Sequence, residues 1–92
     1  MEPAYKEAVT KSIENNNKIR ELQGQYLDDL AKKKDAELRG DANAAAEYTK
    51  SAQKKIDAIN RLNDAQKGYY DDIEQYELYA KNISEGNYNA VI

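Results

Sequence analysis

The stretch that decides the fold runs from Ala45 to Ile83 and reads AAEYTKSAQKKIDAINRLNDAQKGYYDDIEQYELYAKNI. Steps of alternately three and four residues along it visit twelve positions, of which all but Lys55 and Gln66 are apolar or aromatic. A narrow seam with this repeat drifts around a straight helix, so it stays against a neighbour only when the two helices supercoil. A helix lying on a globular core favours a broader apolar stripe. The pattern therefore predicts a coiled-coil-like helix.

The N-terminal half carries a weaker version of the same repeat. Its positions are Tyr5, Val9, Ser12, Asn16, Ile19, Gln23, Tyr26 and Leu30. A flanking apolar row widens this stripe, and its members are Ala8, Ile13, Leu22, Leu27 and Ala31. Polar residues on a helical seam cost stability and tend to fix register or partner number. A wide stripe interrupted in this way indicates contacts with more than one neighbouring helix.

The segment Leu38-Arg39-Gly40-Asp41 is the predicted break between two helices. Glycine adopts the left-handed conformation that ends many helices, and aspartate caps the next helix by accepting from its free N–H groups. A short break of this kind returns the chain antiparallel to itself. The alternative is one uninterrupted helix in a parallel assembly, with Gly40 tolerated inside it at about 1 kcal/mol. We expect a single hairpin domain over 1–85, with helices over 4–38 and 42–84, a turn over 39–41 and a flexible tail over 86–92.

If the helices pair antiparallel about Arg39, most polar residues of one seam face polar residues of the other. Tyr5 then meets Ile73, Ser12 meets Gln66 and Gln23 meets Lys55, while Asn16 opposite Leu62 is the misfit. Tyrosines at heptad spacing usually pack, with the hydroxyl at the edge of the seam. The expected hairpin core consists of Val9, Ile19, Tyr26, Leu30, Tyr48, Ile59, Leu62, Tyr69, Ile73 and Tyr76.

Composition argues against most kinds of chemistry. The 92 residues contain no Cys and no His, which removes disulfides, thiolate metal sites, cysteine nucleophiles and the usual general base near neutral pH. No phosphate-binding loop or other catalytic motif is present. No apolar run approaches the roughly 20 residues of a membrane span, and the N-terminus lacks the layout of a secretory signal. We expect a cytoplasmic, non-enzymatic protein with no cofactor, no metal site and no small-molecule substrate.

A two-helix hairpin buries one seam and leaves the flanking apolar row uncovered, and below about 70–80 residues one core seldom stabilises a fold unaided. The simplest cover is a second copy, which would make an antiparallel four-helix bundle with an all-α fold. A different partner protein would serve equally.

Tyrosines and acidic residues gather in the last quarter of the chain, where residues 68–92 hold five acidic residues and one basic residue. Exposed tyrosines are favoured in interfaces, so this surface is a candidate for docking a basic partner. The expected interface residues are Ala8, Ile13, Leu22, Leu27, Ala31, Tyr70, Asp71, Asp72, Glu74 and Tyr79.

These features together predict a protein–protein interaction module, such as a small scaffold, adaptor, inhibitor or assembly factor. The frequent use of Asn, Lys, Ile and Tyr is compatible with a phage or mobile-element product. The basic runs Lys32-Lys33-Lys34 and Lys54-Lys55 raise one alternative, an RNA-binding four-helix dimer. An acidic chain without a long basic stripe argues against nucleic acid.

Two short motifs raise a further alternative. Leu38-Arg39-Gly40 lies where a Trp-x-Gly turn would join two helices, and residues 70–74, YDDIE, fit the pattern Tyr-x-x-x-Asp/Glu. In these motifs and in size the chain resembles the Trp-x-Gly family of helical-hairpin proteins exported by type VII secretion, in which the Tyr signal follows the second helix. This chain has no Trp, and its Tyr pattern falls inside the predicted second helix. The resemblance implies an exported hairpin that leaves the cell with a partner and without a cleaved signal peptide.

Overall fold

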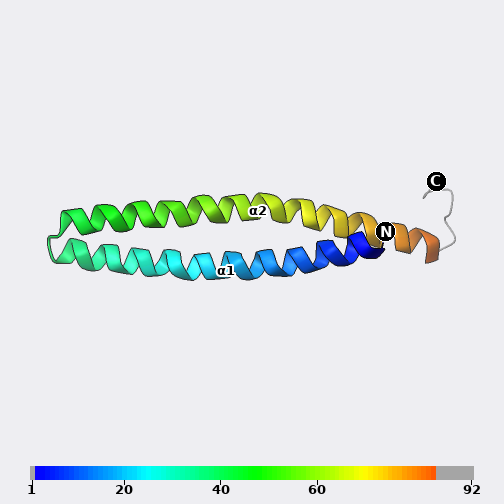
Figure 1. Cartoon of the computed structure of the whole chain (residues 1–92), viewed down its shortest axis with the longest axis horizontal. Helices are drawn as coiled ribbons and strands as arrows, with labels where there is room; N and C mark the ends of the chain where they lie inside the picture. Colours follow the sequence, from blue (N-terminus) through cyan, green and yellow to red (C-terminus); the bar gives the residue numbers. More distant parts are fainter. Residues whose placement is uncertain (1, 85–92) are drawn as a thin grey trace.

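The computed structural model describes residues 2–84, which form two long antiparallel helices (Figure 1). Helix α1 spans Glu2–Leu38 and helix α2 spans Ala42–Ser84. The rod measures 69 × 17 × 15 Å, and its length agrees with the roughly 65 Å that the 43 residues of α2 span at about 1.5 Å each. The predicted all-α hairpin is confirmed, and the alternative of one continuous helix is wrong. The expected tail over 86–92 lies outside the described residues.

The turn between the helices is built from local hydrogen bonds around Gly40, which has a φ of 76°. The N–H of Asp41 donates to the carbonyl of Ala36 at 2.9 Å, and the N–H of Gly40 donates to that of Glu37 at 3.1 Å. This pair of bonds is typical of a helix that ends at a left-handed glycine. Asp41 also caps α2, because its Oδ1 accepts from the N–H of Ala44 at 3.0 Å. One aspartate thus closes α1 through its backbone and opens α2 through its side chain.

The seam of α2 follows the heptad positions. From Ala45 to Tyr76, every position of the repeat is buried or half-buried, including Lys55 and Gln66. Ala80, the next position, is exposed. It lies in the last turns of α2, which extend past the beginning of α1 (Figure 1).

The seam of α1 differs from the predicted one at every second position. Its residues at 5, 12, 19 and 26 are buried or half-buried as expected. At each of the other positions, the residue that turns inward is the one just before the predicted residue. Of the four residues that the sequence predicted at these positions, Val9 and Asn16 are half-buried at the edge of the seam, whereas Gln23 and Leu30 are exposed. The residues that turn inward are Ala8, Asn15, Leu22 and Asp29.

Polar pairing explains which row of α1 faces inward. Both rows offer two apolar and two polar residues, so apolar content does not separate them. Only the observed row lets Asn15 reach Gln66 and Asp29 reach Lys55 across the seam. The expectation that Leu30 belongs to the hairpin core is therefore wrong, since its side chain is 37 % exposed.

Residues that face each other across the seam are equally far along the chain from a point between Gly40 and Asp41. The sequence predicted that this midpoint would be Arg39. Tyr5 stacks on Tyr76, with ring centroids 4.3 Å apart, instead of meeting Ile73. The same register pairs Asn15 with Gln66, whose side chains are hydrogen-bonded at 2.7 Å. The expected contact between Ser12 and Gln66 also forms, at 2.9 Å.

The buried apolar residues of the hairpin are few and small. Apart from Ile19, the apolar side chains that the structure buries within residues 4–82 are all alanines: Ala8, Ala36, Ala45 and Ala52. The other expected core residues are half-buried, and they are Val9, Tyr26, Tyr48, Ile59, Leu62, Tyr69, Ile73 and Tyr76. A single seam of this kind removes little apolar surface from water, so much of the stabilisation that burial could provide is unrealised in one hairpin.

Candidate functional site

One face of α1 carries large apolar side chains that α2 does not cover. Ile13 is 57 % exposed, Leu27 is 64 % exposed and Leu30 is 37 % exposed. Together with half-buried Val9 they form a stripe beside the seam, because steps of three and four residues connect them along one side of a helix. These apolar residues lie at the two ends of the stripe, and the polar residues Asn16, Arg20 and Gln23 lie between them on the same side of α1. We call Val9, Ile13, Leu27 and Leu30 the outer α1 stripe.

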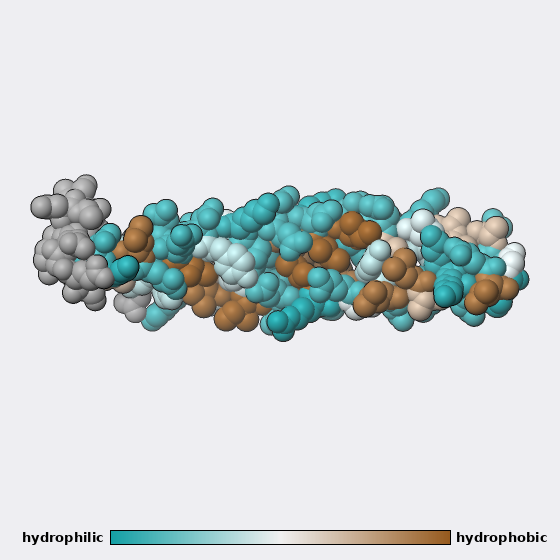
Figure 2. Space-filling view, turned by 180° about the vertical axis from the view of Figure 1, so that it is seen from behind, coloured by the Kyte–Doolittle hydropathy of each residue, from teal (hydrophilic) through white to brown (hydrophobic). Residues whose placement is uncertain are grey.

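Three of the five residues expected in the flanking row of α1 are exposed, namely Ile13, Leu27 and Ala31. The other two, Ala8 and Leu22, turn into the seam, which corrects their assignment to an outward surface. Ala8 is only 5 % exposed. Figure 2 shows apolar side chains in separate groups between hydrophilic ones along one face of the rod.

Tyr70 lies on the same side of the hairpin as the outer α1 stripe. Its hydroxyl accepts a hydrogen bond from Nδ2 of Asn16 at 3.3 Å, and Asn16 lies between Ile13 and Leu27 on that side of α1. Amide donors, Asn16 foremost and then Gln66, lower the pKa of Tyr70 because they stabilise the phenolate. The Tyr70 side chain is 51 % exposed, so it adds an aromatic contact next to the stripe.

A polar cluster is buried in the seam where Asn15, Ser12 and Gln66 meet. Nδ2 of Asn15 donates to the Leu62 carbonyl and to Oε1 of Gln66, both at 2.7 Å. Nε2 of Gln66 donates to Oγ of Ser12 at 2.9 Å and to its carbonyl at 3.2 Å. Among the described side chains, no buried nitrogen or oxygen lacks a hydrogen-bond partner. The bond between Asn15 and Gln66 forms in this register, so the cluster favours the observed alignment of the two helices.

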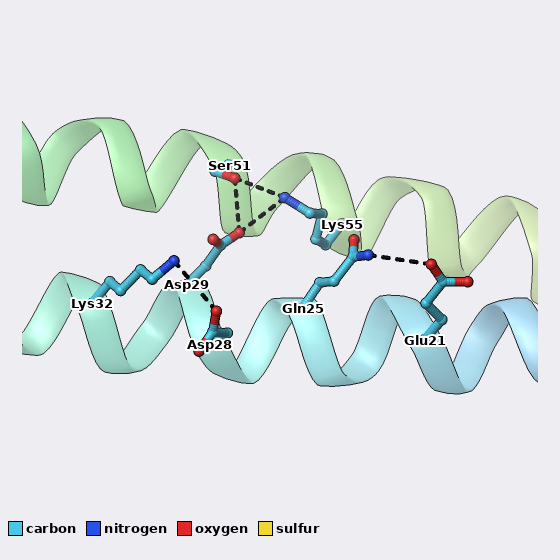
Figure 3. Close-up of polar contacts among 7 residues, drawn as sticks. All are labelled: Glu21, Gln25, Asp28, Asp29, Lys32, Ser51 and Lys55. Atoms are coloured by element: carbon cyan, nitrogen blue, oxygen red, sulfur yellow. Dashed lines mark hydrogen bonds and ion pairs between the residues drawn. The ribbon is translucent and has the colours of Figure 1, made fainter.

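A second polar cluster joins the helices nearer the turn (Figure 3). Nζ of Lys55 donates to Oδ2 of Asp29 at 3.1 Å and to Oγ of Ser51 at 2.8 Å, and Ser51 donates to the same carboxylate oxygen at 2.8 Å. The Asp29 side chain is 13 % exposed and that of Lys55 is 24 % exposed. The hydrogen bond from Ser51 and then that from Lys55 lower the pKa of Asp29. Lys55 therefore pairs with Asp29, whereas the sequence predicted Gln23 opposite it.

A groove runs along the side of the hairpin opposite the outer α1 stripe. It reaches the open end of the hairpin, which is the end away from the turn, where α1 begins and α2 ends. It consists of three adjoining depressions that share residues: Asp72 lines the first two, and Tyr69 lines the second and third. The first depression, at the open end, is formed by Tyr5, Tyr76, Asp72, Gln75 and Ala4. We call this sequence of depressions the tyrosine groove.

The structure divides the acidic and aromatic residues that the sequence placed on one docking surface. Tyr70 and Asp72 are two positions apart, so their side chains point to nearly opposite sides of α2. Asp72 lines the tyrosine groove, and the ring of Tyr79 lies 6.5 Å from that of Tyr76. Asp71 and Glu74 are exposed and line none of the three depressions.

Sequence reasoning did not identify Tyr5 and Gln75 as surface residues of this groove. Tyr5 was identifiable as a seam residue, but its partner depends on the register, and the register depends on the buried polar cluster. Gln75 carries no sequence signal of its own.

No family model, curated protein or solved structure matches this chain. Within residues 2–84 no group of three or more acidic side chains is placed to hold a metal ion, and neither helix is long and apolar enough to cross a lipid bilayer. The motif at Tyr70 lies inside α2, not after it, unlike the arrangement in the Trp-x-Gly family.

The Asp29 cluster predicts a specific acid sensitivity. Because the pKa of Asp29 is lowered in the folded state from 3.8, its ionised form adds stability above that value, and this contribution is lost as the pH falls through the lowered pKa. We expect Asp29→Asn to lower the melting temperature at pH 7 and to flatten its dependence on pH between about pH 5 and pH 2. Thermal unfolding followed by circular dichroism measures both effects.

Asp28→Asn is the matched control, since Asp28 forms an exposed ion pair with Lys32 and its side chain is 67 % exposed. Exposed pairs contribute little, so the melting curve and its pH dependence should stay close to those of the wild type. Equal effects of the two substitutions would contradict the assignment of Asp29 to the helix interface.

Proposed function

We propose that this chain is a non-enzymatic protein–protein interaction module that pairs with a second copy through the outer α1 stripe. The observation that carries the proposal is the exposure of Ile13, Leu27 and Leu30 on one side of a hairpin whose buried apolar residues, apart from Ile19, are alanines. Burying a large aliphatic side chain contributes about 1.5–3 kcal/mol, and these residues realise only part of that in one hairpin.

The distribution of residues along the stripe favours a copy of the same chain as its partner. Ile13 lies toward one end and Leu27 and Leu30 toward the other, with Asn16, Arg20 and Gln23 between them. A twofold axis near Arg20 would place Ile13 of one copy against Leu27 of the other, twice. Such a self-complementary contact is the rule for twofold dimers. The long stem of Arg20 can pack while its guanidinium stays in water.

The resulting assembly would be an antiparallel four-helix bundle, in which each hairpin covers the exposed stripe of its partner. Tyr70 would lie at the edge of this interface and provide an aromatic contact of the kind favoured in such positions. The module would act as a small scaffold, adaptor, inhibitor or assembly factor. The absence of His and Cys from the sequence supports a role that depends on binding and not on catalysis.

Sedimentation equilibrium tests the pairing. We expect the wild type to sediment at twice the chain mass of 10.5 kDa, and Leu27→Asp to sediment as a helical monomer. Losing one buried leucine contact from each copy should weaken association at least tenfold, since about 1.4 kcal/mol corresponds to a factor of ten.

Leu78→Asp is the control, because Leu78 is 53 % exposed but lies on α2, away from the stripe. This variant should remain dimeric. A monomeric wild type, or equal dissociation of the two variants, would refute pairing through the outer α1 stripe.

A further inference from the structure

The open end of the tyrosine groove gathers polar groups that have no partner among the residues whose side chains the structure describes. Among the described residues, no hydrogen bond or ion pair joins the carboxylate of Asp72, the hydroxyls of Tyr5 and Tyr76 or the amide of Gln75 to another residue. All four residues line the same depression. By contrast, Asp29 and Glu7 are each paired with a lysine of this chain.

The walls of this depression suit a cation. The rings of Tyr5 and Tyr76 are stacked, with an interplanar angle of 22°, and a stacked pair presents the outer face of a ring to a neighbouring group. The face of an aromatic ring attracts a lysine ammonium or an arginine guanidinium within about 6 Å. The carboxylate of Asp72, lining the same depression, adds a charged acceptor for the same group.

The size and charge of the groove argue for a protein segment as the occupant. The depression holds about 240 Å³, below the roughly 300–1,000 Å³ of most small-molecule pockets, and it continues into two further depressions along the hairpin. Asp72 lines the open end of the groove, whereas Lys11 and Lys18 line its inner end. A bound segment would therefore place its basic residue at the open end.

We propose that the tyrosine groove docks a basic segment of a partner protein, with one lysine or arginine side chain held against the Tyr5–Tyr76 stack and paired with Asp72. This inference rests on the proposed role as a protein-interaction module, but it uses a surface on the opposite flank from the outer α1 stripe. Each hairpin carries a complete groove, so binding does not require the dimer.

The test is fluorescence anisotropy with a labelled Ala–Lys peptide of about 16 residues, titrated with the full chain. The wild type should bind it with an affinity that falls as salt is raised. Asp72→Asn should weaken binding about tenfold or more, because a hydrogen bond to a charged group contributes about 1.5–3 kcal/mol. Asp71→Asn is the matched control: it removes the same charge from the adjacent residue outside the groove, and it should weaken binding no more than about threefold.

Several outcomes would overturn the proposal. Equal weakening by Asp72→Asn and Asp71→Asn would show that the peptide senses only the overall charge. An Ala–Glu peptide of the same length that bound equally well, or a labelled RNA oligomer that bound in place of the Ala–Lys peptide, would exclude a basic protein segment as the occupant. Absence of any binding by the wild type would do the same.

The Leu27→Asp variant separates this proposal from pairing through the outer α1 stripe. If both proposals hold, Leu27→Asp is monomeric and still binds the Ala–Lys peptide with the wild-type affinity. A dimeric wild type without peptide binding refutes the groove alone, whereas a monomeric wild type that binds the peptide refutes the pairing alone.

Discussion

Replacing Leu62 with aspartate should unfold most of the chain at 25 °C. Leu62 lies in the seam of α2, and its own carbonyl accepts a hydrogen bond from Nδ2 of Asn15 at 2.7 Å. Removing a packed leucine side chain costs about 2–5 kcal/mol, and an unpaired carboxylate in the seam adds its own desolvation cost. Small domains are stable by only about 5–15 kcal/mol, and a hairpin with so little buried apolar surface belongs at the low end. Loss of the helical signal in circular dichroism measures the effect, and Ile59→Asp should behave in the same way.

The control for this prediction adds no charge to the seam. Asp71→Ala combined with Asp72→Ala changes two exposed residues, and surface changes of this kind usually alter stability by less than about 0.5 kcal/mol. The double variant should therefore melt close to the wild type. A Leu62→Asp variant with a wild-type melting curve would mean that the seam is assigned to the wrong face of α2, and unfolding by the aspartate pair would place those residues in the core.

Replacing Gln66 with alanine should cost about 2–4 kcal/mol, because the change removes buried hydrogen bonds and leaves a space in the seam. Gln66 is 5 % exposed and bonds both Asn15 and Ser12. Without it, Oγ of Ser12 loses its donor and Nδ2 of Asn15 loses one of its two acceptors. Urea unfolding gives the change in free energy.

The matched experiment replaces both partners with apolar residues. Asn15→Leu combined with Gln66→Leu removes both amides from the seam and fills their space with apolar groups, so the double variant should be more stable than Gln66→Ala. It should also lose the preference for one register, which crosslinking of cysteines placed at the two ends of the rod would detect. A double variant as unstable as Gln66→Ala would contradict the view that this cluster contributes specificity more than stability.

The helices and the turn were predictable because their causes are local. Expected and observed bounds of the second helix are both 42–84, and those of the first helix differ only at its beginning. Gly40 and Asp41 end one helix and begin the next through bonds that reach no further than Ala36 and Ala45. Apolar periodicity likewise located the seam of α2, where ten consecutive heptad positions turn inward.

The inward row of α1 was not predictable in this way. The two candidate rows contain the same number of apolar residues, so the choice depends on which polar residues find partners on α2. Asn15 and Asp29 find Gln66 and Lys55, and this also shifts the register and determines that Tyr5 meets Tyr76. Ala8 and Leu22 consequently leave the outer surface, and Leu30 joins it.

The sequence by itself determined that two helices form, where they end, that they fold back on one another and which face of α2 is covered, because hydrogen bonds and side-chain periodicity within each segment decide these features. Only the tertiary structure decided which face of α1 is covered, and so which apolar residues remain exposed and which tyrosines border the groove. The physical reason is that a buried polar group must find its partner across the interface, and that partner lies about fifty residues away in the chain.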